Sequence, residues 1–291
     1  MKDFSVIIPT YNNAVTVITS IKCVIDQTFT NWELVIVDDG STDDTEKQIA
    51  PFLEDQRIKY VKQKNQGDTV ARNHGASLTT GEFICFLDSD DKVTNNWLQD
   101  FYDLKKPNTG YISCGWIARG KKSFPALKDK ISKNKYSSLS GTFSVRRDIF
   151  REVGGYDPLL IQSTNWEFTA RAIKCCEKHN LSIDYTNNCN FEYTIHSDPS
   201  KISMRDGKRA EATLYMHNKY KDSGVLHFRK NGFLNSSAIN YVRVGEIKKS
   251  RKVFHKLLKE DFSLKNIANV IAFEIPFVRR KLWGRKLPKK K

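Results

Sequence analysis

Short apolar runs alternate with helical patterns through the first ninety residues, and this alternation constrains the fold more than any other feature of the sequence. The apolar runs are 6–8, 34–37, 58–61 and 83–87, and the helical patterns between them are 14–26, 42–53 and 68–78. A strand followed by a helix and a second strand forms a βαβ unit, whose strands lie parallel in one sheet. We therefore expect an α/β fold with a mostly parallel sheet and helices on both of its faces.

Polar, sharply turning residues follow each of the four predicted strands. They are Pro9-Thr10-Tyr11-Asn12, Asp38-Asp39-Gly40-Ser41, Asn65-Gln66-Gly67 and Asp88-Ser89-Asp90-Asp91. In an open parallel sheet, ligands bind in the crevice beyond the carboxyl ends of the strands. The sequence thus predicts that these four segments converge on one ligand site.

The last of these segments carries three carboxylates within four residues, directly after a run that should form a buried strand. Asp88, Asp90 and Asp91 repel one another unless a cation or solvent relieves the charge. Hard oxygen ligands at this spacing suit Mg²⁺ or Mn²⁺ with bound phosphates, and Asp90 is the expected ligand, with Asp88 beside it. The alternative interpretation is a solvated acidic turn that caps a helix over 94–104.

Two further segments favour a nucleotide diphosphate as the ligand. Asp39, at the end of the second predicted strand, can accept a hydrogen bond from a base edge or a ribose. Arg72 lies in Ala71-Arg72-Asn73-His74-Gly75, on the first turns of a helix aimed at the same crevice. An arginine there suits a diphosphate, or else a structural ion pair with an aspartate.

Together these segments resemble the family 2 glycosyltransferases of GT-A fold. The resemblance rests on motifs in order and in spacing over residues 1 to about 110, namely Ser5–Asn12, Val37–Ser41, Asn65-x-Gly67 with Ala71–Gly75, and Phe86–Asp91. It implies a metal-dependent, inverting transfer of a sugar from a nucleotide diphosphate, commonly uridine diphosphate, to a glycan or lipid-linked glycan. The implied nucleotide-sugar site is Pro9, Thr10, Tyr11, Asp39, Asn65, Arg72, Asp88 and Ser89, and the implied ligand of Mn²⁺ or Mg²⁺ is Asp90.

The catalytic base is where the sequence departs from this family. Members usually place a Glu-Asp pair at the start of a helix that later carries an arginine, and counting back from Arg171 puts Thr164 and Asn165 there. Asparagine cannot accept a proton at neutral pH. Glu167 is the nearest carboxylate and our expected base, with a solvated glutamate on the helix face as the alternative. His196 falls where many relatives carry a histidine that reaches the metal or the diphosphate, so it is a second candidate metal ligand, with a structural role as the alternative.

The end of the chain has the pattern of basic amphipathic helices. From Glu246 to Lys291 there are 15 Lys or Arg against 4 Asp or Glu, so most of the net charge of +15 lies there. Such a segment suits an anionic membrane surface. We expect 277–291 to bind the membrane and 246–259 to pack on the catalytic domain, and we disfavour nucleic acid as a partner because the charge is terminal and the motifs lie elsewhere.

These observations predict a catalytic domain over 1–222 and a basic helical region over 223–291. The domain would comprise a nucleotide-sugar-binding half at 1–110 and an acceptor half at 111–222. No stretch approaches the roughly 18 apolar residues of a membrane span, and the six cysteines show no metal-ligand spacing. We therefore expect a cytoplasmic enzyme, peripheral on the cytoplasmic face of the membrane. The alternatives are a non-catalytic relative that binds nucleotide sugar or glycan, and a nucleotidyltransferase, which would want a Gly-rich phosphate loop after the first strand.

Overall fold

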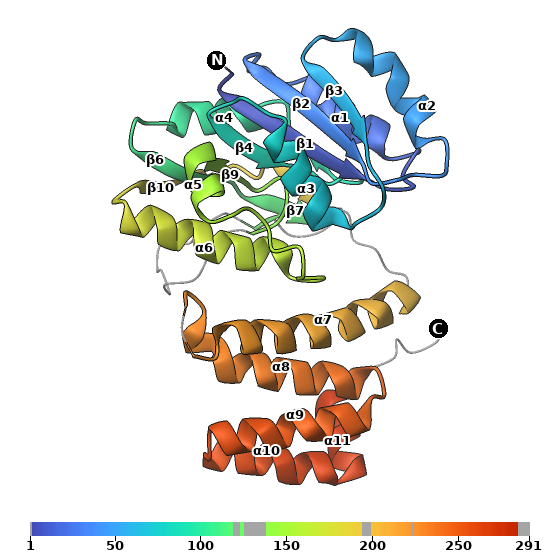
Figure 1. Cartoon of the computed structure of the whole chain (residues 1–291), viewed down its shortest axis with the longest axis vertical. Helices are drawn as coiled ribbons and strands as arrows, with labels where there is room; N and C mark the ends of the chain where they lie inside the picture. Colours follow the sequence, from blue (N-terminus) through green and yellow to red (C-terminus); the bar gives the residue numbers. More distant parts are fainter. Residues whose placement is uncertain (1, 119–122, 125–137, 194–198, 223, 285–291) are drawn as a thin grey trace. The chain divides into compact units, whose positions relative to one another are not determined.

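The computed structural model describes residues 2–118, 123–124, 138–193, 199–222 and 224–284. The chain divides into two compact units, of which the first consists of Met1–Pro158 and Thr164–Ile195 and the second of Leu159–Ser163 and His196–Lys291. Helix α7 (Pro199–Tyr220) belongs to the second unit (Figure 1). The main boundary therefore falls near residue 196, before α7, whereas the sequence placed it after residue 222.

The first unit is built on a seven-stranded sheet with the order β10-β6-β9-β4-β1-β2-β3. Its parallel part consists of β1 (Phe4–Thr10), β2 (Trp32–Asp38), β3 (Ile58–Lys62) and β4 (Phe83–Phe86). The connections carry α1 (Val17–Ile25), α2 (Thr45–Ile49) with a 3₁₀ turn (Ala50–Glu54), and α3 (Asp68–Ser77). These elements match the alternation in the sequence, so the predicted α/β fold with a mostly parallel sheet is confirmed.

The rest of the sheet differs from a simple repeat of βαβ units. β9 (Phe143–Arg146) runs antiparallel between β4 and β6 (Thr109–Ser113), and β10 (Ser182–Tyr185) pairs with β6 in parallel. The chain leaves this sheet after Ser113, and the N–H of Gly115 donates to the carbonyl of Asn188. A second sheet of order β5-β11-β7-β8 follows, with β5 (Lys92–Val93), β7 (Trp116–Ala118), β8 (Ser123–Phe124) and β11 (Phe191–Tyr193).

Each face of the large sheet has its own apolar core, because alternate residues of a strand point to opposite faces. Val6 and Ile8 of β1 pack with α1 and with α4 (Trp97–Leu104) on one face. Ile7 packs on the other face with α5 (Arg147–Glu152) and α6 (Thr164–Lys178), and α3 also covers this face. Gly75 permits the close approach of α3, since a Cβ there would lie 2.6 Å from Ile7 Cγ2.

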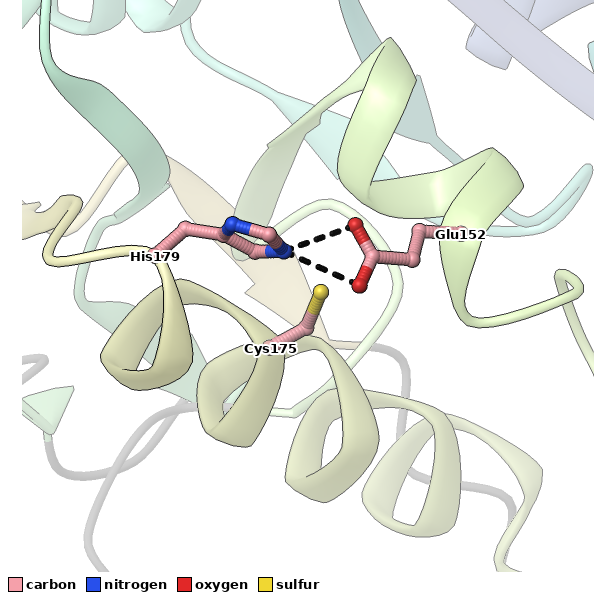
Figure 2. A group of neighbouring side chains, drawn as sticks. All are labelled: Glu152, Cys175 and His179. Atoms are coloured by element: carbon pink, nitrogen blue, oxygen red, sulfur yellow. Dashed lines mark hydrogen bonds and ion pairs between the residues drawn. The ribbon is translucent and has the colours of Figure 1, made fainter.

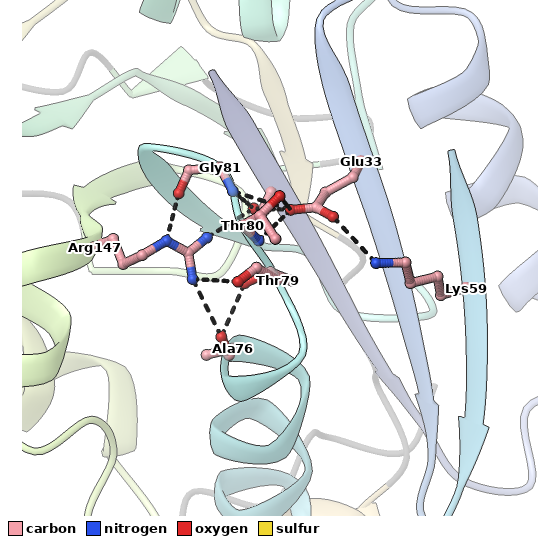
Figure 3. A network of polar contacts seen from close by, with 8 residues as sticks. Glu33, Lys59, Ala76, Thr79, Thr80, Gly81 and Arg147 are labelled. Carbon is pink, nitrogen blue, oxygen red and sulfur yellow. Dashed lines mark hydrogen bonds and ion pairs between the residues drawn. The ribbon is translucent and has the colours of Figure 1, made fainter. Parts of the chain in front are cut away.

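A buried polar network closes the edge of the sheet where the strands begin (Figure 3). Glu33 Oε1 accepts hydrogen bonds from Ser5 Oγ at 2.8 Å, Thr80 N at 2.5 Å and Gly81 N at 3.0 Å. Arg147 donates from Nε to the Gly81 carbonyl at 2.5 Å and from Nη2 to Ser5 Oγ at 3.0 Å. Burial raises the pKa of Glu33, but the hydrogen bonds from Thr80, Ser5 and Gly81 outweigh it and the net shift is downward. These contacts connect β1, β2 and the turn before β4 at this edge.

The second unit, as far as the structure describes it, is helical. It contains α7, a 3₁₀ turn (His227–Arg229), α8 (Lys230–Arg243), α9 (Ile247–Glu260), α10 (Leu264–Glu274) and α11 (Pro276–Trp283). In α9, Phe254 and Leu257 are buried while Lys248 and Lys252 are exposed, as the amphipathic pattern predicted. The helical basic appendage is thus confirmed. Among the described helices, none combines the length and the apolar character needed to cross a membrane.

Candidate active site

A cavity of about 260 Å³ lies where the parallel strands end. Its walls are formed by Pro9, Thr10, Tyr11, Asn13, Asp39, Asp68, Arg72, Asp88, Ser89 and Asp90. Every residue predicted for the donor site, except Asn65, is in this lining, together with the predicted metal ligand Asp90. The convergence of strand ends that the motifs implied is therefore present in the structure.

Asp39 follows β2 and holds the loop between β3 and α3. Its carboxylate accepts hydrogen bonds from the backbone N–H groups of Gln66 at 2.9 Å and Gly67 at 2.7 Å, and from Gln63 Nε2 at 2.8 Å. Gly67 has a φ of +94°, a backbone conformation that glycine adopts without strain. Asn65 is exposed in the same loop and does not line the cavity. Asp39 thus forms a rigid wall of the cavity, whereas Asn65 is not part of the cavity lining.

Arg72 brings a buried positive charge to the cavity. Its side chain is 4% exposed, and its guanidinium donates from Nη1 to Asp68 at 2.5 Å and from Nη2 to Asp88 at 2.7 Å. Burial lowers the pKa of Arg72, but the charges of Asp88 and Asp68 outweigh it and the net shift is upward. The guanidinium therefore stays charged, and its Nε has no hydrogen-bond partner among the residues that the structure describes. A charged guanidinium at a cavity wall suits a diphosphate.

The three aspartates after β4 occupy different environments. Asp88 is paired with Arg72 and its side chain is 36% exposed, Asp90 lines the cavity, and Asp91 is buried and lies outside the lining. The carbonyl of Asp91 accepts a hydrogen bond from Ser20 Oγ at 2.8 Å, which fixes the turn. Asp90 with Asp88 offers hard carboxylate oxygens on one wall, the ligand type that Mn²⁺ and Mg²⁺ take. The residues present fit a divalent cation.

Asn165 lies in the first turn of α6, and its carboxamide contacts residues next to the cavity. Nδ2 donates to Ser140 Oγ at 3.1 Å, and Oδ1 accepts from the hydroxyl of Tyr156 at 2.7 Å. Ser140 Oγ also accepts from Arg72 Nη2 at 3.5 Å. Ser140 therefore links Asn165 to the Arg72–Asp88 ion pair. A carboxamide there can orient its neighbours but cannot take up a proton.

Of the other two predicted catalytic or metal residues, only Glu167 lies in the described structure, and it does not line the cavity. Glu167 is 1% exposed and forms a bidentate ion pair with Arg171, with distances of 2.9 Å to Nε and 2.7 Å to Nη2. Arg171 also donates to the carbonyl of Val153 at 2.6 Å. This geometry gives Glu167 a structural role and offers no support for its assignment as the base. His196 lies outside the described residues, so its role stays a prediction.

Sequence reasoning missed four residues at or beside the cavity: Asn13, Asp68, Ser140 and Tyr156. Asp68 could have been predicted from the sequence, because it precedes Arg72 by four residues and side chains at this spacing meet on a helix surface. Asn13 belongs to the turn after β1 and donates to Ser89 Oγ at 2.6 Å. Ser140 and Tyr156 carry no local signal, since only long-range packing brings them to Arg72.

The fold and the cavity define a GT-A-type α/β protein with a candidate nucleotide-sugar site. Residues 5–160 match the profile of glycosyl transferase family 2. Because this match spans more than half of the chain, the protein belongs to that family.

Among curated proteins, a GalNAc(5)-diNAcBac-PP-undecaprenol beta-1,3-glucosyltransferase of Campylobacter jejuni is 37% identical over 114 residues, which is 38% of this chain and 36% of that protein. The chain spans well under half the length of the curated relatives that it matches, between 14% and 36% of them.

Two solved structures resemble the chain over most of its length. TarS residues 1–349 of S. aureus in complex with UDP-GlcNAc has a TM-score of 0.70 at 18% identity, covering 96% of this chain and 87% of that one. The mannosyltransferase PcManGT from Pyrobaculum calidifontis, in complex with GDP-Man and Mn²⁺, has a TM-score of 0.62 at 15% identity, covering 96% and 87%. At these identities the likeness supports the fold alone, which is the GT-A fold.

The buried ion pair of α6 gives the first prediction. Glu167→Gln should lower the free energy of unfolding by about 3 kcal/mol, because it leaves the largely buried Arg171 without its carboxylate. Urea denaturation followed by circular dichroism measures this change. Glu177→Gln is the matched control on the same helix, since the Lys174–Glu177 pair is exposed and should contribute little. Equal losses in the two variants would contradict the structural role.

Proposed function

We propose that this chain is an inverting, Mn²⁺- or Mg²⁺-dependent glycosyltransferase that uses a UDP-linked sugar donor. The observation that carries the proposal is the cavity at the strand ends, where the buried charge of Arg72 faces the same space as Asp39 and Asp90. The UDP-GlcNAc complex of TarS supports a uridine nucleotide. The Mn²⁺ in the PcManGT complex supports a divalent cation.

In this proposal the donor's diphosphate lies between two positive charges, the bound cation and the guanidinium of Arg72. Asp90, with Asp88 beside it, would hold the cation, which when bound neutralises the charge of the departing diphosphate. Arg72 supplies a fixed positive charge that is already desolvated and oriented by its two carboxylate partners. Asp39, immobilised by the β3–α3 loop, accepts hydrogen bonds from the base or the ribose.

The acceptor half of the reaction depends on position 165. Inverting displacement needs a base that removes the proton of the acceptor hydroxyl, and family resemblance puts that base at residue 165. Asn165 offers only a carboxamide, so we infer that acceptor activation limits the rate in this chain. The same observation favours a second candidate function, nucleotide-sugar binding without turnover.

We further propose that α10 and α11 bind an anionic membrane that carries a lipid-linked acceptor. Leu264 and Ile271 lie seven residues apart on one face of α10 and are 85% and 58% exposed, and Ile275, which follows α10, and Phe277 of α11 are 46% and 74% exposed. Contiguous exposed apolar side chains on a helix face mark an interaction surface. The neighbouring run Arg279-Arg280-Lys281 complements anionic headgroups. The undecaprenol-linked acceptor in the name of the Campylobacter relative is consistent with this partner.

Donor binding provides the direct test of the main proposal. With Mn²⁺, UDP at about 100 times its Kd should stabilise the chain by about 2.7 kcal/mol, seen as a rise in the melting temperature. Asp90→Asn should abolish the Mn²⁺-dependent part of this rise, because it removes the carboxylate that holds the cation. Asp26→Asn is the matched control, since Asp26 is an exposed aspartate at the end of α1 that does not line the cavity. The proposal fails if no nucleotide stabilises the protein, or if Asp90→Asn behaves like Asp26→Asn.

The acceptor side is tested by restoring a carboxylate. Asn165→Asp should raise the rate of UDP release from UDP-sugar by about 10²-fold, because it supplies a base beside the donor site. The UDP-induced thermal shift should stay as in the unmodified chain. Asn165→Ala removes the amide without adding a base and should give no gain in rate. If Asn165→Asp is no faster than Asn165→Ala, position 165 is not where the acceptor is activated.

The membrane proposal is tested with vesicles of phosphatidylglycerol. Phe277→Glu should reduce binding about tenfold or more, because burial of a Phe side chain contributes about 1.5–3 kcal/mol. Phe228→Glu is the control, since Phe228 lies in the same unit outside α10 and α11 and is 63% exposed. Vesicle co-sedimentation measures both variants. Equal binding to neutral phosphatidylcholine vesicles, or no loss in Phe277→Glu, would contradict the proposal.

A further inference from the structure

Three side chains of metal-ligating type meet at the end of α6, away from the cavity (Figure 2). Cys175 lies in the last turn of α6 and His179 directly follows its last residue, and the N–H of His179 donates to the carbonyl of Cys175 at 3.1 Å, so the two side chains lie on one face of this helical turn. Glu152, the last residue of α5, points toward both of them. Its two carboxylate oxygens each lie 2.9 Å from His179 Nε2.

We propose that Glu152, Cys175 and His179 form a zinc site that links the end of α5 to the end of α6. The ligand types select the ion, because a thiolate and an imidazole with one carboxylate suit Zn²⁺, whereas Mg²⁺ and Ca²⁺ prefer oxygen ligands alone. Three protein ligands leave the fourth tetrahedral position for a water molecule.

The three ligand atoms already lie close together. One ligand atom from each residue lies within 4.8 Å of the others. Zinc distances of about 2.0–2.3 Å set tetrahedral ligand atoms roughly 3.3–3.7 Å apart. The atoms must therefore approach by about 1 Å, which side-chain rotations of the half-exposed Glu152 and His179 can supply without movement of the helices.

Zinc would replace contacts that the ligands already make. His179 Nε2 lies 2.9 Å from both carboxylate oxygens of Glu152, so these two side chains are already adjacent. On binding, the Cys175 S–H bond breaks, its proton goes to solvent, and a Zn–S bond forms. Lys178, whose Nζ lies 3.0 Å from Glu152 Oε1, is the cation that zinc must displace.

This site is separate from the proposed donor cation. Asn165 begins the same helix beside the cavity, and at 1.5 Å per residue His179 lies about 21 Å further along its axis. A zinc ion there would not touch a nucleotide sugar. Its effect would be to hold the C-terminal ends of α5 and α6 together and so to stiffen the helix whose first turn carries Asn165.

The test uses the full chain, stripped of metal with a chelator. Co²⁺ should bind one equivalent and give the thiolate charge-transfer band and the visible spectrum of a tetrahedral cobalt site, and Zn²⁺ should displace it. Cys175→Ser should abolish the charge-transfer band, and His179→Gln should weaken Zn²⁺ binding by about tenfold or more. Cys189→Ser, which removes a partly exposed thiol elsewhere, should leave both measurements unchanged.

His179→Gln and one further variant, Lys178→Gln, keep the result interpretable. His179 is 43% exposed, so His179→Gln should fold even if Cys175→Ser does not. Lys178→Gln removes the competing cation and should tighten Zn²⁺ binding. The proposal is overturned if the cobalt spectrum persists in Cys175→Ser, if Cys189→Ser abolishes it, or if Lys178→Gln and His179→Gln leave the Zn²⁺ affinity as it was. Asp90→Asn should not change Zn²⁺ binding, so failure here and failure of the donor site are distinguishable.

Discussion

The parallel pairing of β1 with β2 and β4 is the constraint on which the rest of the structure depends. In this register Thr10 lies beside Asp38 and Ile7 beside Phe86, so the turns after three strands open at one edge. Residues far apart in the chain become walls of one cavity for this reason alone. At the opposite edge, where the strands begin, hydrogen bonds of Glu33 and Arg147 connect the start of β1 and β2 to the turn before β4.

The cavity is preorganised by a buried cation among carboxylates. Desolvating Arg72 would be costly in isolation, and its pairs with Asp88 and Asp68 offset that cost. These contacts also fix the guanidinium before any ligand arrives, and the bonds from the β3–α3 loop fix Asp39 in the same way. Residue 165 belongs to this network through Ser140. Asp88, Arg72, Ser140 and Asn165 therefore form one connected set of side chains, on which both halves of the proposed reaction would depend.

The sequence was sufficient for the parts of the structure that local patterns encode. Strand and helix periodicity placed β1 to β4 with the helices between them, and the turn residues together with Arg72 predicted eight of the ten residues that line the cavity, all but Asn13 and Asp68. It was insufficient where distant segments decide the outcome. The insertion of β9 between β4 and β6 has no local pattern that distinguishes it, whereas the i,i+4 spacing of Glu167 and Arg171 is a local pattern that favours their ion pair. Cys175 and His179 do have helical spacing, but their third partner, Glu152, lies on another helix.

The position of β9 also sets the order in which this chain can fold during synthesis. β9 lies between β4 and β6, yet both neighbours leave the ribosome before it does. Until residues 143–146 arrive, β4 and β6 each present an unpaired apolar edge, the kind of surface that recruits other chains. Non-local pairing of this kind is slow, whereas α8 and α9 are joined through short connections and pack locally. The helical end of the protein can therefore reach its final packing soon after it is made, and completion of the sheet is the step at which a nascent chain is most exposed to aggregation.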